Sequence, residues 1–372
     1  MPVAVACLCL CLFGCSGAST PAASTTQPVQ SPVSPVASTA PPGVKQVMNF
    51  GGSITCGYYA TQQGASGNIY SQLGYAGLFD SSLNVPSQNL CRYGDQAADT
   101  VRTAVYPHTA PALGAGQLYT VMVGTNDAGC GISAGCMGNW SGSLNAALTW
   151  LALPAGDKIT GSSLPNPGAS WTPDLDFGIA TNSAGATLSF PVPQTIAGRT
   201  LYIAYRVFDP GTVNGGTASV EIDGSSVATL KTISDTGHAI STKNGLADTI
   251  VVASIPLGAV GAHTLLLRTG STGGFFSFQW AGVSSGSYAG VGGAPRVMVA
   301  TLPASTDAGL NINISTYNTA LTQMIGALTN EGMYITLVPC ASVLNPATDY
   351  HDTVHPNDSG HKKLAAAFEA AL

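Results

Sequence analysis

Charge is scarce in this sequence. Only 8% of its 372 residues are Asp, Glu, Lys or Arg, the formal net charge is −6, and Lys362-Lys363 is the only adjacent basic pair. Nucleic-acid binding depends on clustered Lys and Arg side chains that neutralise phosphates. The composition therefore argues against a nucleic-acid partner, and its abundance of Gly is typical of exported, β-rich or sugar-handling proteins.

The apolar run at the amino end, Met1–Phe13, is too short to span a bilayer as a helix. It ends in Leu12-Phe13-Gly14-Cys15 and resembles a bacterial lipoprotein signal, in which Cys15 would carry the lipid. An ordinary cleaved signal peptide is the alternative, and no Lys or Arg precedes the run as either signal would have it. Both interpretations predict export, either to the bacterial cell envelope through a lipid anchor or by secretion.

Cysteines never occur as a C-x-x-C pair, and the His residues are scattered, so the sequence predicts no metal site and no cofactor. Five of the nine cysteines follow the predicted signal, and in an exported protein they can form at most two disulfides. These five are Cys56, Cys91, Cys130, Cys136 and Cys340. Cys130 and Cys136 close a short glycine-rich loop and are the first choice for a pair.

Two short stretches at opposite ends of the chain carry candidate catalytic groups. Gly51-Gly52-Ser53-Ile54-Thr55 places a serine in a glycine-rich turn, and Asp352-Thr353-Val354-His355 supplies a carboxylate and an imidazole. Serine becomes a good nucleophile only when a base takes its proton, and a carboxylate holds histidine in the right tautomer. The spacing predicts that Asp352 and His355 share one face of a helical turn, with His351 on the opposite face.

Two further segments lie between these stretches. One is Asn89–Asp99, which contains Arg92-Tyr93-Gly94-Asp95, and the other is Val121–Asp127, which ends in Gly124-Thr125-Asn126-Asp127. Taken in order, the four blocks resemble the SGNH (GDSL-type) hydrolase family over roughly residues 44–153 and 290–372.

The resemblance implies a role for each matching residue. Ser53 would be the nucleophile, His355 the general base and Asp352 the acid that orients it. The N–H groups of Ser53 and Gly94 and the side-chain amide of Asn126 would form the oxyanion hole.

The sequence departs from the family pattern at two positions. Gly52 stands where the family usually has Asp, and Cys91 stands where it usually has Gly. Because the segments around Cys56 and Cys91 converge in this family, the resemblance also implies a Cys56–Cys91 disulfide that braces the oxyanion hole.

Hydrophobic runs predict the fold. The nearly continuous apolar segments 47–50, 118–123, 297–302 and 334–338 indicate buried parallel strands. Helical spacing of apolar residues around 144–151 and 314–328, and a final helix over 362–372, fill the intervals. This alternation predicts a doubly wound, flavodoxin-like α/β sheet with helices on both faces and a site at the carboxyl ends of its strands.

Residues 159–288 break this rhythm, because apolar residues there alternate, as at Leu201, Ile203 and Tyr205. Such alternation, with the hairpin signal Asp223-Gly224, predicts an inserted antiparallel β-sandwich that resembles jelly-roll modules that bind carbohydrate. Four aromatic residues could stack on sugars or, more ordinarily, fill the core. They are Trp171, Tyr202, Tyr205 and Trp280.

The predicted organisation has five segments. They are a signal (1–15), a Ser/Thr/Pro-rich linker (16–43), a first hydrolase part (44–158), the β-sandwich (159–288) and a second hydrolase part (289–372). The favoured function is hydrolysis of acyl esters, with acetyl groups on polysaccharide as the preferred substrate, by a monomer. The alternatives are a lipase or lysophospholipase for longer acyl chains, and an inactive carbohydrate-binding surface protein.

Overall fold

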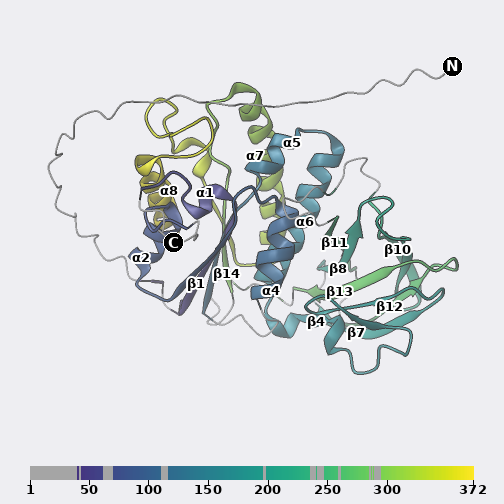
Figure 1. Cartoon of the computed structure of the whole chain (residues 1–372). Helices are drawn as coiled ribbons and strands as arrows, with labels where there is room; N and C mark the ends of the chain where they lie inside the picture. Colours follow the sequence, from purple (N-terminus) through teal and green to yellow (C-terminus); the bar gives the residue numbers. More distant parts are fainter. Residues whose placement is uncertain are drawn as a thin grey trace, which may run out of the picture. The chain divides into compact units, whose positions relative to one another are not determined.

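A computed structural model describes most of the chain after the predicted linker (Figure 1). The predicted signal with Cys15, and nearly all of the linker, lie outside the described residues. These are residues 40–41, 43–61, 70–109, 116–195, 198–234, 240, 247–258, 261–284, 286, 288 and 295–372. Within them, no helix is long and apolar enough to cross a membrane.

One sheet is parallel throughout and has the order β15-β14-β3-β1-β2. Its strands are β1 (Gln46–Gly51), β2 (Ser87–Cys91), β3 (Gln117–Met122), β14 (Arg296–Ala300) and β15 (Ile335–Val338). This is the strand order of flavodoxin-like sheets, in which ligands bind beyond the carboxyl ends of the strands. Four of the strands are the predicted apolar runs, and the fifth, β2, was not predicted.

Helices cover both faces of this sheet (Figure 1). On one face α6 (Ala134–Ala152) and α7 (Ala308–Asn330) pack against a core that includes Phe50, whereas α2 (Tyr75–Leu83) and α8 (Asp358–Ala370) cover the opposite face, which includes Val47. Neighbouring strand residues point to opposite faces, so a strand buried on both sides needs an unbroken apolar run. The prediction of a mixed α/β fold is confirmed.

Short helical segments connect the larger elements. They are α1 (Ser53–Cys56), α3 (Ala97–Asp99), the π-helix η1 (Thr100–Val105), α4 (Tyr106–His108), α5 (Thr125–Cys130) and the 3-10 turns η2 (Ala155–Asp157), η3 (Gly161–Ser163) and η4 (Cys340–Ser342).

Two antiparallel sheets form between residues 158 and 283, as the alternating pattern predicts. One has the order β10-β9-β12-β7 and the other β11-β8-β13-β6-β5, with β4 also paired to β13. The strands are β4 (Lys158–Thr160), β5 (Thr172–Asp174), β6 (Gly178–Thr181), β7 (Thr187–Thr195), β8 (Thr200–Phe208), β9 (Thr217–Ile222), β10 (Ser225–Lys231), β11 (Asp248–Pro256), β12 (Gly261–Thr269) and β13 (Phe276–Val283). A common apolar core joins the inner faces of both sheets.

The predicted hairpin is present between β9 and β10. Ser225 pairs with Ile222, which leaves Asp223 and Gly224 as a two-residue loop with φ angles of 52° and 81°. Positive φ at both central residues is the signature of the type I′ turn that Asp-Gly favours.

The outer face of β8, β11 and β13 packs against the helix layer of the parallel sheet. A register shift in β13 between Phe278 and Trp280 turns Trp280 away from the core that holds Phe278. A bulge re-aims the side chains that follow it, so Trp280 joins the core of α6, where its indole N–H donates to the Tyr106 hydroxyl. The predicted alternative of a core role holds for Trp280, although its core lies outside the sandwich.

Candidate active site

Ser53 begins α1 directly after β1, at the carboxyl end of the parallel sheet. A Cβ atom on Gly51 would lie 2.2 Å from Thr55 Oγ1 and 2.3 Å from the Met122 carbonyl oxygen. Only glycine allows the chain to turn this tightly between the strand and the helix.

Gly52 allows a second close approach. A Cβ atom there would lie 3.2 Å from Asn126 Nδ2 and 3.4 Å from the Asp95 carbonyl oxygen. Gly52, which stands where the resembled family usually has Asp, thus lets the Asn126 amide pack tightly against the serine turn.

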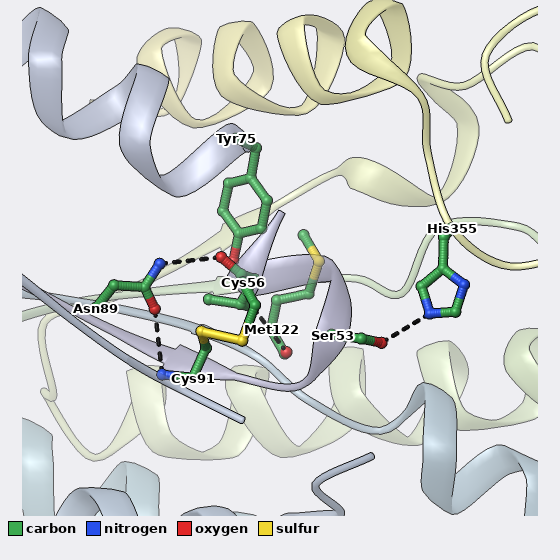
Figure 2. The surroundings of a disulfide bond; sticks show 8 residues. Ser53, Cys56, Tyr75, Asn89, Cys91, Met122 and His355 are labelled. Carbon is green, nitrogen blue, oxygen red and sulfur yellow. Dashed lines mark hydrogen bonds between the residues drawn. A yellow bond between two sulfur atoms is a disulfide. The ribbon is translucent and has the colours of Figure 1, made fainter. Parts of the chain in front are cut away.

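The fold brings Ser53 and His355 into hydrogen-bond contact across 302 positions of sequence (Figure 2). Ser53 Oγ lies 2.9 Å from His355 Nε2, and His355 Nδ1 lies 2.8 Å from Asp352 Oδ2. Both distances are those of ordinary hydrogen bonds. A hydroxyl, an imidazole and a carboxylate thus form one continuous chain.

The predicted helical turn at Asp352 is wrong, because residues 351–354 form a bend. Instead, Asp352 Oδ1 accepts the N–H groups of Val354 and His355, each at 2.7 Å. Asp side chains stabilise such turns by bonding to their own backbone two or three residues on. One carboxylate oxygen therefore shapes the turn while the other holds the imidazole.

The ionisation of Asp352 reflects these contacts. Partial burial favours the neutral acid, but the N–H and imidazole of His355 and the N–H of Val354 outweigh it and hold the pKa of Asp352 below its ordinary value. The carboxylate that faces His355 is therefore charged at neutral pH.

His351, the rival base, lies elsewhere. Its N–H donates to the His355 carbonyl oxygen at 2.9 Å, and its ring stacks on Tyr59 with the centroids 3.9 Å apart. His351 therefore has an aromatic partner, while His355 is the imidazole hydrogen-bonded to Ser53.

Asn126 lies beside the serine, and its use as an oxyanion donor stays a prediction. An open pocket is lined by residues of both the serine turn and the segment after β3, including Ser53, Gly124 and Asn126. Asn126 Nδ2 donates one hydrogen bond of 2.9 Å to the Asp95 carbonyl oxygen. An amide nitrogen carries two hydrogens, so a second donor remains for a ligand in this pocket.

Gly94 lies in the turn next to Asp95, with a φ of 78° that favours glycine. Asp127 fixes this turn from the other side, because its carboxylate accepts the Ala97 N–H at 3.1 Å. Complete burial raises the pKa of Asp127 to about 7, although the Ala97 N–H lowers it. The use of the Gly94 N–H as an oxyanion donor stays a prediction.

Two disulfides hold this region, and they are the pairs expected. Cys56 is bonded to Cys91, and Cys130 to Cys136, whereas Cys340 is buried with a free thiol. The first disulfide joins α1 to the end of β2 (Figure 2), and Asn89 adds a 3.0 Å hydrogen bond to the Thr55 carbonyl oxygen. The serine turn is therefore tied to the strand that leads into the Gly94 turn.

A group of aromatic residues around His355 was not singled out in the sequence. Tyr58 meets the His355 ring edge-on at 4.8 Å between centroids and meets Tyr93 at 4.5 Å. Tyr59 lies 4.2 Å from Tyr58 and 5.7 Å from His355. The adjacent tyrosines after the serine turn were the only available signal, since Tyr93 and His351 come from distant segments.

No group of three or more His, Cys, Asp and Glu side chains within the described ranges is arranged to hold a metal ion.

Comparison with known proteins gives only distant likenesses. No protein-family model and no curated protein matches the sequence. Among solved structures, a member of the lipolytic protein G-D-S-L family from Veillonella parvula is 12% identical, with 87% of this chain and 96% of that chain covered and a TM-score of 0.39.

Carbohydrate-binding modules match a smaller part of the chain. A CBM36 module solved with calcium and xylotriose is 13% identical over 34% of this chain and 98% of its own, with a TM-score of 0.26. The C-terminal CBM6 of LamC from Zobellia galactanivorans is 20% identical over 34% and 96%, also with a TM-score of 0.26. These likenesses are too distant to assign the chain to a family, so its function has to rest on the geometry of the site.

Proposed function

We propose that this protein is a serine esterase. The observation that carries the proposal is the unbroken contact from Ser53 through His355 to Asp352, with steps of 2.9 Å and 2.8 Å. Nucleophile, base and orienting acid are the three roles that such a chain performs in acyl transfer.

The chemistry follows from the placement of the protons. His355 Nε2 takes the hydroxyl proton as Ser53 Oγ attacks the ester carbonyl, and Asp352 stabilises the imidazolium through Nδ1–H. The tetrahedral intermediate collapses, the ester C–O bond breaks, and His355 gives the proton to the departing alcohol. Water, deprotonated by the same imidazole, then attacks the acyl-enzyme and releases the acid and Ser53.

The negative oxygen of the intermediate needs donors that are already in place. Ser53 and Asn126 both line the pocket, so the N–H of Ser53 and the second hydrogen of Asn126 Nδ2 are two proposed donors. The N–H of Gly94 is proposed as the third. Loss of one such donor costs roughly 3–4 kcal/mol in the transition state.

The pocket favours a short acyl group. Its cavity volume is about 10 Å³, about the space that one water molecule needs, which is far below the roughly 300–1,000 Å³ of pockets that enclose drug-sized ligands. An acetyl ester fits this space better than a long-chain one. Two disulfides support export to an oxidising compartment, where acetylated polysaccharide is the proposed substrate.

The test is acetate release from acetylated xylan, mannan and peptidoglycan by wild type and Ser53→Ala. We expect Ser53→Ala to lose at least a thousandfold in rate, because Ser removal abolishes covalent catalysis. The hydrolysis of p-nitrophenyl acetate should exceed that of the palmitate ester.

Three results would contradict the proposal in different ways. Equal rates of acetate release by wild type and Ser53→Ala would show that the protein is not an esterase that uses Ser53. Faster hydrolysis of the palmitate ester would favour the lipase alternative. Sugar binding with no hydrolysis of any ester would favour the inactive binding protein.

A further inference from the structure

Tyr58 and Tyr59 contact the imidazole of His355, and Tyr93 and His351 extend this group of rings into an aromatic rim. We define this rim as Tyr58, Tyr59, Tyr93 and His351, whose rings are linked by centroid distances of 3.9–4.5 Å. Tyr59 is the only Trp, Tyr or Phe among the described residues with an exposed side chain, at 40%. An exposed aromatic surface beside reactive groups is a natural contact for a ligand.

The chemistry of ester cleavage determines which portion of a substrate lies next to this rim. The departing alcohol receives its proton from His355, so it must lie beside that imidazole when the C–O bond breaks. Tyr58 and Tyr59 both contact the same ring. The pocket with Asn126 has none of the rim residues in its lining. The acyl and alcohol portions of a substrate therefore have separate surroundings.

The rim is built into the fold through covalent and polar ties. The Cys56–Cys91 disulfide lies two residues before Tyr58 and two before Tyr93, so one bond anchors both tyrosines. Beyond Tyr59, the N–H and hydroxyl of Thr61 donate to Asp358 at 2.8 and 2.7 Å. The segment that carries Tyr58 and Tyr59 is thus fixed at both ends.

The backbone of Tyr59 adds a second indication. Its φ of 64° lies in the left-handed region, which is unfavourable for a residue other than glycine. Such strain persists only where surrounding structure imposes it, and it is concentrated at ligand sites. The surrounding structure that imposes this conformation includes the stack of the Tyr59 ring on His351.

We infer that the aromatic rim is the subsite for the alcohol portion of the ester and that it stacks against a sugar ring. A sugar ring has C–H faces that match an aromatic face and hydroxyl edges that match polar neighbours. Tyrosine offers both properties, an apolar ring and a hydroxyl tip. The polar side chains of Arg92, His351 and Asp352 are exposed near the rim. They can hydrogen-bond to the hydroxyl groups of a sugar, which a hydrocarbon alcohol lacks.

This inference rests on the proposed esterase function and names its substrate class. The experiment compares wild type, Tyr59→Ala, Tyr59→Phe and the control Ile312→Ala, whose side chain is 65% exposed on α7. The substrates are acetylated xylo- and manno-oligosaccharides, vinyl acetate, which has no ring, and phenyl acetate, whose ring is flat and apolar. The readout is kcat/KM from acetate release.

We expect Tyr59→Ala to lose about tenfold on the better sugar ester and less than twofold on vinyl acetate. Tyr59→Phe should lose less than Tyr59→Ala on the sugar ester, because it keeps the ring and lacks only the hydroxyl. The unchanged vinyl acetate rate also shows that the variant is folded. Equal effects of Tyr59→Ala on all esters, or none, would overturn the inference and leave the esterase intact. A loss on phenyl acetate alone would overturn the inference of a sugar and indicate that the rim binds an aryl alcohol. A wild-type protein that is inactive on every ester would overturn the proposed function itself.

Discussion

At the rim of the candidate active site, Tyr59 exposes 40% of its surface, whereas none of the eleven Trp, Tyr and Phe side chains between residues 159 and 288 is exposed. The four suggested as sugar platforms illustrate the contrast. Trp171, Tyr202 and Trp280 are buried, and Tyr205 is half-buried. The inserted sheets therefore offer no aromatic platform, and the surface suited to stacking lies on the parallel-sheet portion.

The buried aromatics of the insert serve packing. Trp280 contacts Trp150 of α6 at 5.6 Å between centroids, and Trp150 stacks on Phe177 at 4.6 Å. Tyr202 joins the same core. Because residues of the parallel-sheet portion and of the insert fill one core, the insert acts as part of the folded body rather than as a module on a tether.

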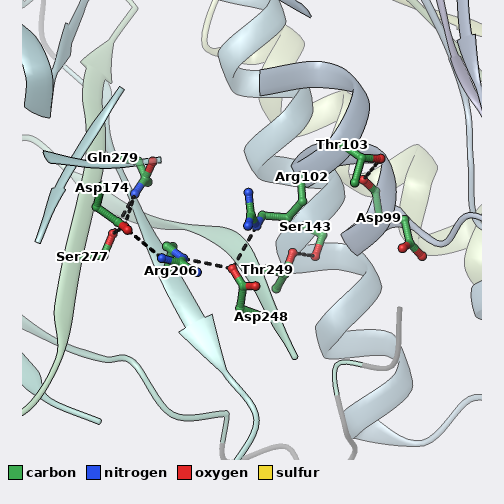
Figure 3. A network of polar contacts seen from close by, with 10 residues as sticks. All are labelled: Asp99, Arg102, Thr103, Ser143, Asp174, Arg206, Asp248, Thr249, Ser277 and Gln279. Carbon is green, nitrogen blue, oxygen red and sulfur yellow. Dashed lines mark hydrogen bonds and ion pairs between the residues drawn. The ribbon is translucent and has the colours of Figure 1, made fainter. Parts of the chain in front are cut away.

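Polar contacts join the same two portions (Figure 3). Arg102 of η1 pairs with Asp248 of β11 at 2.9 Å, and Arg206 of β8 pairs with both Asp248 and Asp174. The side chains are 8–15% exposed. A largely buried network with two cations and two anions is balanced in charge, and it fixes relative position because each partner is costly to leave unpaired.

The largest expected effect tests whether the insert stabilises the body. Trp280→Ala should lower the free energy of unfolding by about 3–5 kcal/mol, since it leaves a cavity in the shared core and an unpaired Tyr106 hydroxyl. Urea unfolding measures the change. Val227→Ala, at a side chain 46% exposed on β10, is the control and should cost less than about 0.5 kcal/mol. A cost below about 1 kcal/mol for Trp280→Ala would show that the insert is energetically separate.

A change of pH can show whether the parallel-sheet portion and the insert unfold together. Asp80 on α2 is buried, which raises its pKa to about 6 despite hydrogen bonds from Asn49 and Ser87. Between about pH 4 and pH 6 the folded state keeps a proton that the unfolded chain has released. The contribution of Asp80 to stability therefore falls as pH rises through this window, by about 3 kcal/mol at most, and levels off above it.

Asp80→Asn should make the fall in stability between pH 4 and pH 7 smaller by about 3 kcal/mol at most and leave the part due to Asp127, whose pKa burial raises to about 7. Asp176→Asn, at an exposed position, should leave the whole fall unchanged. The measurement is urea unfolding at pH 4 and pH 7, with hydrogen exchange of the β9 and β12 amides as a local probe of the insert. If the two portions form one cooperative unit, these amides will show the same pH dependence. If Asp80→Asn leaves the exchange of these amides unchanged, the insert unfolds independently of the parallel-sheet portion.

The same contrast explains what the sequence could predict. Strands buried on both faces have continuous apolar runs, so β1, β3, β14 and β15 were recognisable. β2 (Ser-Gln-Asn-Leu-Cys) is an edge strand with polar, exposed residues and has no such signal. The sandwich was predicted from alternation, but the bulge that turns Trp280 toward α6 was not, because periodicity says nothing of a local register shift.

At the site, the sequence supplied the identities of Ser53, Asp352 and His355 through the resemblance and their spacing. It failed on the turn at Asp352, where side-chain bonds to the backbone replace a helix. It also missed the aromatic rim, since three separate segments contribute to it and no spacing relates them. Long-range convergence of this kind depends on the whole fold.

The smallest expected effect concerns the polar contact between body and insert. Arg102→Met keeps most of the apolar stem but removes its charged hydrogen bond to Asp248. We expect a loss of about 1.5 kcal/mol, the low end for a hydrogen bond to a charged group, because Asp248 retains Arg206. Arg268→Met is the matched control, since Arg268 is 50% exposed and lies 3.5 Å from Glu221. That exposed pair should contribute less than about 1 kcal/mol. Equal losses in urea unfolding would mean that the buried network adds nothing beyond an ordinary surface ion pair, and the apolar core around Trp280 alone would then hold the insert in place.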